Sequence, residues 1–205
     1  MAKRCVIISG GEFSDAVSFA AEDLVIACDR GYEYAKRLGA APGLIVGDFD
    51  SYEGALPEGV PVLRLPREKD DTDTMHAVRC ALERGCDEIV LTCALGGRLD
   101  HALANLQSCV YALRQGARVS ICDESAKVFF LEGGSLTLPA ETGRSLSLLS
   151  FSPRCEGVGI SGVKYPLDNA VLESDFPLGV SNEWTESQAL VSVGSGTLMV
   201  VLAKE

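Results

Sequence analysis

Residues 89–101 read IVLTCALGGRLDH, a stretch that combines an apolar run, a glycine pair and the beginning of an amphipathic segment. The apolar run Ile89–Cys93 is typical of a strand that is buried on both faces of a parallel sheet. The following segment, Asp100–Gln115, carries its apolar residues on one helical face and stops before a glycine, which is a common helix terminator. A strand followed by a loop and a helix predicts one unit of an α/β sheet.

The same alternation of apolar runs and amphipathic segments extends over the first 124 residues. We therefore expect an α/β first domain, residues 1–124, built on a doubly wound, mostly parallel sheet with helices on both faces. Its ligand should lie beyond the carboxyl ends of the strands. The expected strands are Cys5–Ile8, Leu24–Cys28, Leu44–Val46, Val60–Leu65, Ile89–Cys93 and Val119–Cys122, and the expected helices are Tyr32–Leu38, Thr74–Arg84 and Asp100–Gln115.

Beyond about residue 125 the pattern changes to short runs separated by Gly, Pro, Ser and Asn, and no helix of about ten residues fits. Repeated short strands with such turn signals predict a second domain, residues 125–205, that is all-β and sandwich-like. Its expected strands are Ala126–Leu131, Ser135–Leu138, Ser145–Phe151, Ala189–Val193 and Thr197–Leu202.

Composition excludes several classes of protein. A net charge of −11 argues against non-specific nucleic-acid binding, which requires a basic surface, and 47% hydrophobic residues suit a globular core. No apolar stretch reaches the roughly 18 residues that a membrane span requires, so we expect a soluble, cytoplasmic protein with no membrane partner. Eight cysteines without any C-x-x-C pair indicate reduced, buried thiols rather than a zinc site.

Three short polar segments carry most of the chemistry: GDFDS at 47–51, KDDTD at 69–73 and GGRLDH at 96–101. Each follows an apolar run directly or after a few loop residues, and parallel strands end at one edge of their sheet. So many carboxylates would repel one another unless a cation lay among them. Mg²⁺ is commonly held by a few carboxylates together with substrate phosphates. The segments therefore predict a Mg²⁺–nucleotide site, with Asp48, Asp50, Asp70 and Asp73 as the metal ligands.

The glycine pair Gly96-Gly97 predicts a phosphate contact, because it lets the backbone approach an anion at the N-terminus of the next helix. Arg98 adds a planar guanidinium suited to phosphate oxygens. Lys69, beside two aspartates, fits a phosphate-and-metal arrangement better than a helix cap alone would require.

Simpler roles remain open for several residues. Asp48 and Asp50 could simply make local turns. Asp71 could cap the start of a helix or be a solvated residue there. Thr72 could cap that helix or contact phosphate. His76 and His101 lie on expected helices, where surface and packing roles are commoner than catalysis. The sequence contains neither G-x-x-x-x-G-K-[ST] nor G-x-G-x-x-G, which disfavours P-loop and nicotinamide-cofactor chemistry.

In order and spacing, these segments resemble those of the thiamine pyrophosphokinase family over nearly the whole chain. The family's early element is more commonly Asp-Gly-Gly, whereas this chain has Asp29-Arg30-Gly31, so the resemblance implies no ligand role for the Arg30 side chain. The matching elements are Asp29-Arg30-Gly31, Gly47–Ser51, Lys69–Asp73, Gly96–His101 with Asn105, Ser161–Leu167 and Val180–Glu183.

The resemblance implies transfer of the pyrophosphoryl group of Mg²⁺-ATP to the hydroxyl of thiamine, giving thiamine diphosphate and AMP. It also implies an α/β nucleotide domain, a β-sandwich domain, and a homodimer with thiamine bound where the subunits meet. The roles it implies are catalysis for Asp100, Asp73, Lys69 and Arg98; nucleotide binding for Asp29, Gly31, Lys69, Thr72, Gly96, Gly97, Arg98 and Asn105; and thiamine binding for Tyr165, Ser181, Asn182 and Asp100.

Two alternatives stay open at this point. One is a pyrophosphokinase for another hydroxymethyl heterocycle, such as a pterin, which need not carry the elements around Tyr165 and Asn182. The other is a non-catalytic thiamine or nucleotide sensor, which would be expected to have lost acidic residues that this chain retains.

Overall fold

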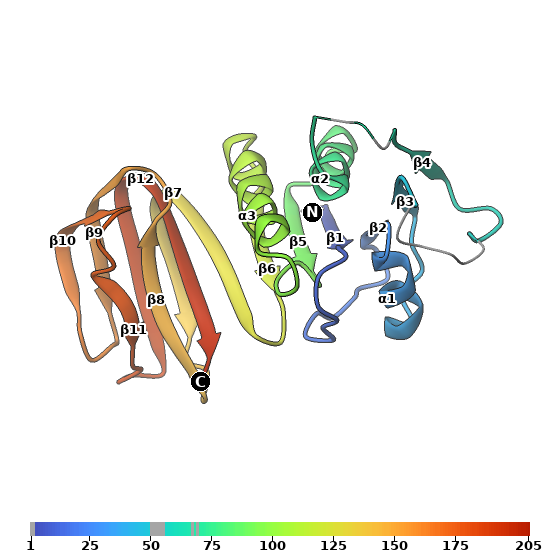
Figure 1. The fold of residues 1–205 in the computed structure, drawn as a ribbon. Coiled ribbons are helices and arrows are strands. Elements are labelled where there is room, and N and C mark those ends of the chain that lie inside the picture. The colour runs from blue at the N-terminus through green and yellow to red at the C-terminus, as the bar shows by residue number, and fades with distance from the viewer. Residues whose placement is uncertain (1–2, 50–55, 67, 69) are drawn as a thin grey trace. The chain divides into compact units, whose positions relative to one another are not determined.

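The computed structural model describes residues 3–49, 56–66, 68 and 70–205 of the chain. Its fold is α/β, and it divides into two compact units, Met1–Glu124 and Ser125–Glu205 (Figure 1). Parallel strands and helices make up the first unit, whereas the second consists of antiparallel strands. Within the described ranges, no helix is long and apolar enough to cross a membrane.

Among its described residues, the first unit contains six parallel strands in the order β6-β5-β1-β2-β3-β4. Strand order reverses at β1, since β2 lies on one side of it and β5 on the other. Each strand coincides with an expected apolar run to within one or two residues at either end. The six strands are β1 (Arg4–Ile8), β2 (Leu24–Cys28), β3 (Leu44–Gly47), β4 (Val62–Arg64), β5 (Glu88–Thr92) and β6 (Arg118–Cys122).

Three helices accompany this sheet within the described residues: α1 (Gly31–Leu38), α2 (Asp73–Glu83) and α3 (Leu99–Arg114). Tyr34 and Ala35 of α1 pack against Ala27 of β2. The next residue, Cys28, points the other way and donates a hydrogen bond from its Sγ to the Asp73 carbonyl of α2 at 3.7 Å. Because neighbouring side chains of a strand point to opposite faces, α1 and α2 cover opposite faces of the sheet.

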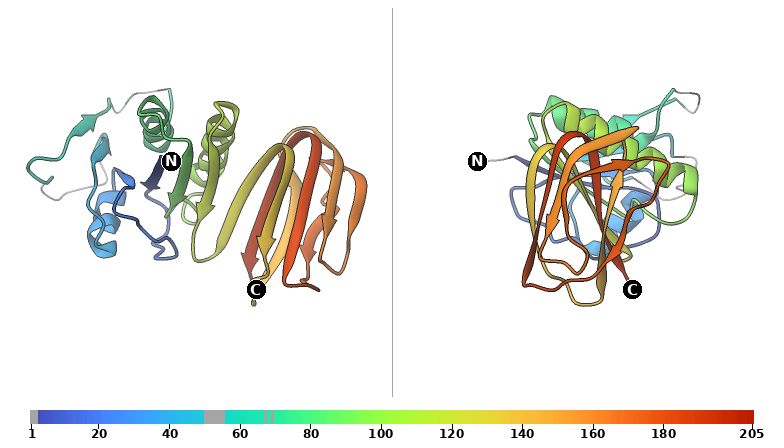
Figure 2. Two further views of the ribbon diagram at one scale, coloured as in Figure 1. Left: turned by 180° about the vertical axis from the view of Figure 1, so that it is seen from behind. Right: turned by 90° about the vertical axis from the view of Figure 1, so that its left-hand side faces the viewer.

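The second unit is organised around one long strand, β12 (Gln188–Lys204), which pairs with β7 (Ala126–Pro139) along most of its length (Figures 1 and 2). On its other side, the first half of β12 pairs with β9 and the second half with β8. The remaining strands extend these two branches, β10 beside β9 and β11 beside β8. Their bounds are β8 (Arg144–Ser150), β9 (Arg154–Ser161), β10 (Leu167–Glu173) and β11 (Gly179–Asn182).

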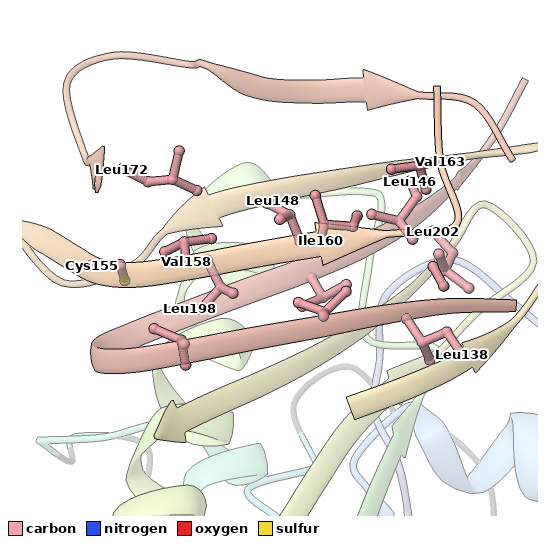
Figure 3. Packing of buried hydrophobic residues seen from close by; sticks show 14 residues of the cluster. Leu138, Leu146, Leu148, Cys155, Val158, Ile160, Val163, Leu172, Leu198 and Leu202 are labelled. Carbon is pink, nitrogen blue, oxygen red and sulfur yellow. The ribbon is translucent and has the colours of Figure 1, made fainter. Parts of the chain in front are cut away.

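One apolar core serves both branches of the second unit (Figure 3). Leu146 and Leu148 of β8 belong to the same buried cluster as Val158 and Ile160 of β9. Leu172 of β10 joins this cluster and is also buried. The two branches therefore bury their inner faces against each other, which neither could do alone.

Three glycines of the second unit mark irregularities inside strands, where the sequence predicted strand ends. Gly133 and Gly134 lie within β7, and Gly196 lies within β12 beside a register shift between Val193 and Thr197. All three glycines have positive φ, between 79° and 86°. Glycine allows a bulge to interrupt the pairing locally while the strand continues. Expecting two short strands in each place was therefore wrong, and β9 to β11 were not expected at all.

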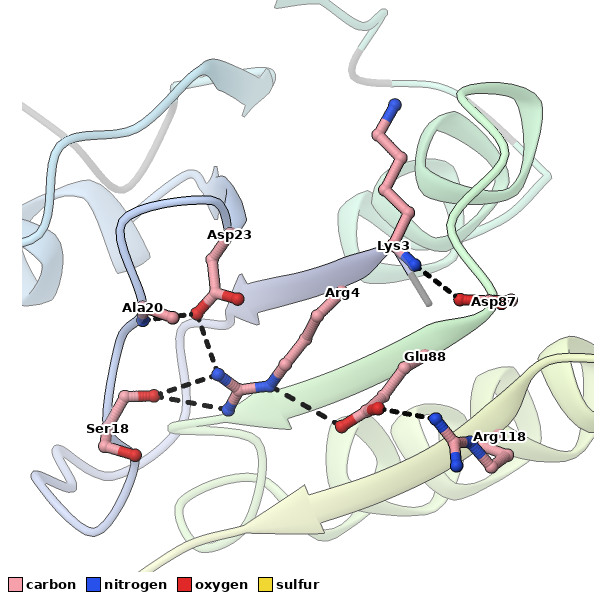
Figure 4. A network of polar contacts seen from close by, with 8 residues as sticks. All are labelled: Lys3, Arg4, Ser18, Ala20, Asp23, Asp87, Glu88 and Arg118. Atoms are coloured by element: carbon pink, nitrogen blue, oxygen red, sulfur yellow. Dashed lines mark hydrogen bonds and ion pairs between the residues drawn. The ribbon is translucent and has the colours of Figure 1, made fainter. Parts of the chain in front are cut away.

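At the amino ends of β1 and β5, charged side chains form a connected network (Figure 4). Arg4 binds Asp23 at 2.7 Å and reaches Glu88 at 3.7 Å, and Glu88 also binds Arg118 at 2.8 Å. Asp23 further accepts a hydrogen bond from the Ala20 amide at 2.8 Å, and its side chain is 1% exposed. Each carboxylate of the network has a partner on a neighbouring segment of the chain.

All eight cysteines are free thiols, in agreement with the expected reduced state, and six of them are buried. Burial raises the pKa of the Cys93 thiol to about 11 and raises the pKa of Cys28 as well. Both thiols are therefore protonated at neutral pH and act as small apolar side chains.

Candidate functional site

A cavity of about 970 Å³ opens at the carboxyl ends of the parallel strands in the first unit. Its walls come from the segments that follow β1, β2, β3 and β5 and from the first turns of α2 and α3, as expected for a ligand site in such a sheet. The described residues that line it are Gly10, Gly11, Glu12, Phe13, Cys28, Asp29, Arg30, Tyr34, Arg37, Asp48, Asp71, Thr72, Asp73, Thr74, Ala94, Gly96, Gly97, Arg98, His101 and Asn105.

Of the predicted metal ligands, Asp48 and Asp73 line this cavity. Asp70 is exposed and is not among the lining residues, and Asp50 lies outside the described residues. Phe49, between the two aspartates of the 47–51 segment, packs against the core beside α1. In the described part of the chain, no three carboxylate, imidazole or thiol groups lie close enough together to hold a metal ion by themselves.

Side chains of Thr72 and Asp71 stabilise the start of α2. Thr72 caps the helix, because its Oγ1 accepts a hydrogen bond from the Met75 amide at 3.2 Å. Asp71 binds His76 Nε2 at 2.6 Å and Arg79 Nη1 at 2.7 Å. Both Asp71 and Thr72 nevertheless border the cavity. The two roles left open for Thr72 are thus compatible, and His76 is held against Asp71 on α2.

The loop after β5 brings the glycine pair to the cavity. Gly96 and Gly97 have φ of 75° and 64°, a left-handed conformation that favours glycine. A Cβ on Gly96 would lie 2.5 Å from the Glu12 side chain, so a larger residue there would require that side chain to move. Lys69, the other predicted phosphate contact besides this loop and Arg98, lies outside the described residues.

Arg98 lines the cavity, and its guanidinium forms a two-pronged ion pair with Asp100, from Nη2 at 2.6 Å and Nε at 3.1 Å. The hydrogen bond from Arg98 lowers the pKa of the Asp100 carboxyl. Asp100 is not among the lining residues and is exposed at the start of α3, while His101 does border the cavity. The Arg98 guanidinium is thus paired with the Asp100 carboxylate at the rim of the cavity.

Two buried polar residues hold the β5 loop. Asn105 lines the cavity, and its Nδ2 donates to the Ala94 carbonyl at 2.8 Å, so its amide supports the loop from α3. Asp123, at the end of β6, accepts hydrogen bonds from the amides of Cys93, Ala94 and Leu95 at 2.6, 2.9 and 2.8 Å. Asp123 could not be singled out from the sequence, because a single aspartate after an apolar run is also typical of a turn.

The Asp29-Arg30-Gly31 element combines three local requirements. Asp29 lines the cavity with φ of 47°, while Arg30 has φ of −54°, a helical value that needs no glycine. Gly31 is buried and lies outside the lining, and a Cβ there would be 2.1 Å from the Ile8 carbonyl oxygen. Glycine is therefore required at 31 for close packing of α1 on β1, whereas the departure at 30 is tolerated.

One wall of the cavity was missed from the sequence. Phe13 and Tyr34 meet edge to face at 5.5 Å, and the Arg37 guanidinium lies 3.5 Å from the Phe13 ring centre. Tyr34 also donates its hydroxyl to the Gly11 carbonyl at 3.0 Å. The signal that could have revealed this wall is the glycine pair at residues 10–11, which follows the β1 run as Gly96-Gly97 follows β5.

Two family models match the chain: the catalytic domain of thiamin pyrophosphokinase over residues 17–121, and the vitamin B1 binding domain of thiamin pyrophosphokinase over residues 135–198. The chain belongs to the thiamine pyrophosphokinase family. It is accordingly an enzyme with thiamine pyrophosphokinase activity, and neither the pterin-type nor the sensor alternative is favoured.

Individual relatives agree with this assignment. The thiamine pyrophosphokinase of Bacillus subtilis is 28% identical over 209 residues, which cover 97% of this chain and 98% of the relative. A crystal structure of thiamine pyrophosphokinase from the same organism has a TM-score of 0.91 at 26% identity, covering 99% of this chain and all of that one. A thiamin pyrophosphokinase family protein from Enterococcus faecalis has a TM-score of 0.82 at 28% identity, and each chain is covered completely.

In the region that matches the family's vitamin B1 binding domain, Asn182 and Tyr165 are bound to each other. Asn182 Oδ1 accepts from the Tyr165 amide at 3.0 Å, and its Nδ2 donates to the Tyr165 carbonyl at 2.8 Å. Lys164 pairs with Glu183 at 2.8 Å beside them. Ser181 has φ of 60°, and its amide donates to Ser147 Oγ at 2.9 Å. The amide of Asn182 thus fixes the backbone that carries the 59% exposed Tyr165 ring.

Proposed function

We propose that the chain transfers the pyrophosphoryl group of Mg²⁺-ATP to the hydroxyl of thiamine, giving thiamine diphosphate and AMP. The observation that carries this proposal is the cavity in the first unit, where a glycine pair, an arginine and several carboxylates meet. It lies next to β1, where the strand order reverses. Ligands of open α/β sheets bind in crevices of this kind.

The triphosphate would lie along the β5 loop and the N-terminus of α3. The amides of Gly96 and Gly97, the positive end of a 16-residue helix and the Arg98 guanidinium all favour phosphate oxygens there. Lys69 completes this group in the proposal on sequence grounds. Asp29 and Gly31 would serve the nucleotide end, the first by contact and the second by keeping α1 close to β1.

The donor set of the cavity fits Mg²⁺, although no preformed three-ligand cluster is present among the described residues. Mg²⁺ is usually bound through one or two carboxylates plus substrate phosphates and water, so Asp48 and Asp73 in one cavity are sufficient. Asp50 and Asp70 belong to the same proposed ligand set. When bound, the ion would neutralise phosphate charge during transfer.

In the reaction, the thiamine hydroxyl oxygen forms a bond to the β-phosphorus while the bond from that phosphorus to the oxygen bridging it to the α-phosphate breaks. AMP leaves with that oxygen, and the hydroxyl proton passes to Asp100 or to solvent water. In this proposal Asp100, at the start of α3, binds the hydroxyl and orients or deprotonates it; the hydrogen bond from Arg98 lowers the pKa of Asp100, which favours its ionised form. Alignment of this kind supplies a large part of phosphoryl-transfer catalysis.

Thiamine would be held by the second unit, residues 125–205. The exposed Tyr165 ring offers a face for the pyrimidine, Asn182 holds that tyrosine in place, and Ser181 lies next to it in the chain. We include in the proposal a homodimer in the cytoplasm, with thiamine bound where two subunits meet. Sedimentation or light scattering of the purified protein tests the dimer.

The proposal includes the finer architecture of both units. Helices on opposite faces of a parallel sheet support a doubly wound first domain over residues 1–124. In the second unit, two branches over one core support a β-sandwich.

The decisive experiment incubates the purified protein with thiamine, ATP and MgCl₂ and separates nucleotides and thiamine esters by chromatography. Thiamine diphosphate that accumulates in step with AMP, and disappears with EDTA, is the expected result. Thiamine monophosphate with ADP would show simple kinase chemistry and contradict attack at the β-phosphorus.

A further inference from the structure

Asp123 is a buried carboxylate, 3% exposed, at the carboxyl end of β6. Its Oδ1 accepts from the Cys93 amide at 2.6 Å and from the Thr92 hydroxyl at 3.2 Å. Its Oδ2 accepts from the amides of Ala94 and Leu95 at 2.9 and 2.8 Å. One carboxylate thus gathers three consecutive backbone amides, the arrangement that also binds anionic ligands in loops.

The opposite side of the same three residues is bound as well. The Cys93 carbonyl accepts from the Gly11 amide at 2.7 Å, and the Leu95 carbonyl accepts from the Glu12 amide at 2.9 Å. The carbonyl of Ala94 accepts from Asn105, as described above. Cys93 itself has φ of 51°, which is unfavourable for a residue with a side chain and persists only where surrounding contacts hold it.

This binding decides which amides of the loop remain for a ligand. The amides of residues 93–95 are taken by Asp123, and the chain then turns through Gly96 and Gly97 into Arg98, all of which line the cavity. If the first three amides moved, the start of the glycine turn would move with them, because Leu95 is joined directly to Gly96.

We propose that Asp123 is a positioning residue for ATP: by holding residues 93–95 it fixes where Gly96, Gly97 and Arg98 meet the phosphates. This inference rests on the proposed binding of ATP in this cavity. Asp123 itself does not border the cavity and acts through the loop.

The chain supplies a matched control in Asp23. It too is a buried aspartate that accepts a backbone amide hydrogen bond, but it lies among the amino ends of the strands, where Arg4 is its partner (Figure 4). A variant of Asp23 therefore loses buried hydrogen bonds without touching the β5 loop.

The test compares Asp123→Asn with Asp23→Asn. An asparagine at 123 places an NH₂ group against backbone N–H donors, so the loop must rearrange. We expect about a tenfold weaker Kd for ATP by calorimetry and a matching rise in KM for ATP, with KM for thiamine within about twofold of wild type. Asp23→Asn should lower the melting temperature and leave both KM values unchanged.

Measurements are made at temperatures where circular dichroism shows each variant folded. An Asp123→Asn protein with wild-type ATP affinity would overturn the proposal, as would equal loss of ATP affinity in Asp23→Asn. If Asp123→Asn does not fold, Thr92→Val, which removes one of the four donors, replaces it. About threefold weaker ATP binding then supports the proposal, and unchanged binding overturns it.

Failure of the proposed function is separately visible. A wild-type protein that binds ATP but forms no thiamine diphosphate would contradict the reaction, while the calorimetric comparison would still decide the role of Asp123.

Discussion

An arginine–aspartate ion pair lies at each end of the parallel strands, one at the amino ends (the amino edge) and one beside the cavity at the carboxyl ends (the cavity edge). The two pairs differ in exposure. Arg4 and Asp23, at the amino edge, are 2.7 Å apart with side chains 24% and 1% exposed. Arg98 and Asp100, at the cavity edge, are 2.6 Å apart with side chains 72% and 64% exposed. Equal distances therefore do not imply equal roles, because solvent weakens the exposed pair and the buried one cannot be broken without leaving a buried charge.

We therefore expect the charged residues at the amino edge to contribute to stability and those at the cavity edge to contribute to function. At the amino edge, every carboxylate of the network in Figure 4 has a fixed partner within the chain. The cavity edge instead presents a pair that water already reaches, so in the proposed function Arg98 would exchange Asp100 for a phosphate at little cost. Four substitutions break or sharpen the contrast.

The largest effect is expected from Asp73→Ala at the cavity edge. Removing one preorganised charge at a phosphoryl-transfer site commonly costs about 10²–10³ in turnover, and we expect that loss here. Steady-state kinetics with thiamine and ATP provide the measurement. Asp87→Ala, at the amino edge where its Oδ1 accepts the Lys3 amide at 2.7 Å, is the matched control and should keep its turnover. Near-normal turnover of Asp73→Ala would refute the metal assignment.

Arg4→Met, at the amino edge, should lower stability and leave turnover unchanged. Asp23 would stay buried without its cation, and breaking such a pair costs about 3 kcal/mol in the free energy of unfolding. Urea denaturation measures this change, and kcat per folded molecule should not move. A variant as stable as wild type would show that the buried pair contributes no more than the exposed one.

Arg98→Lys should reduce kcat/KM about tenfold, because the ammonium keeps the charge but loses the planar fork. Its melting temperature should equal that of wild type, since the pair it breaks is exposed. A lower melting temperature with unchanged kinetics would mean that this pair serves the fold instead.

The smallest effect concerns pH. Arg98 lowers the pKa of Asp100, so the pair's contribution to stability is present above the ordinary aspartate pKa and is lost as pH falls through the lowered value. Arg98→Gln should raise the Asp100 pKa toward the ordinary range, as a carboxyl ¹³C NMR titration would show. An unchanged pKa would assign the shift to another cause.

The sequence predicted the first unit well because its signals are local. Ile89–Cys93 and the helix after it follow from apolar periodicity, and Asp48, Asp73 and Gly96 follow from their places after strands. Asp123 and Phe13 could not be predicted in this way. Their roles depend on segments roughly 30 and 20 residues away, which only the pairing of β6 with β5 and the packing of α1 bring to them.

The second unit was harder for the same reason. Whether Gly133 and Gly196 end a strand or bulge within it depends on the partner strand, which no local pattern reveals. Asn182 matched a family element by sequence, but its double hydrogen bond to Tyr165 is a contact across 17 residues.

The position of β12 in the chain has a consequence for synthesis on the ribosome. Residues 188–204, which form β12, are the main pairing partner of β7, β8 and β9. These three strands are synthesised first, so their edges stay unpaired until β12 has left the ribosome. The first unit is compact and ends at residue 124, so we expect it to fold while the rest is being made. We infer that the nascent second unit is the stage at which this protein most needs protection by chaperones.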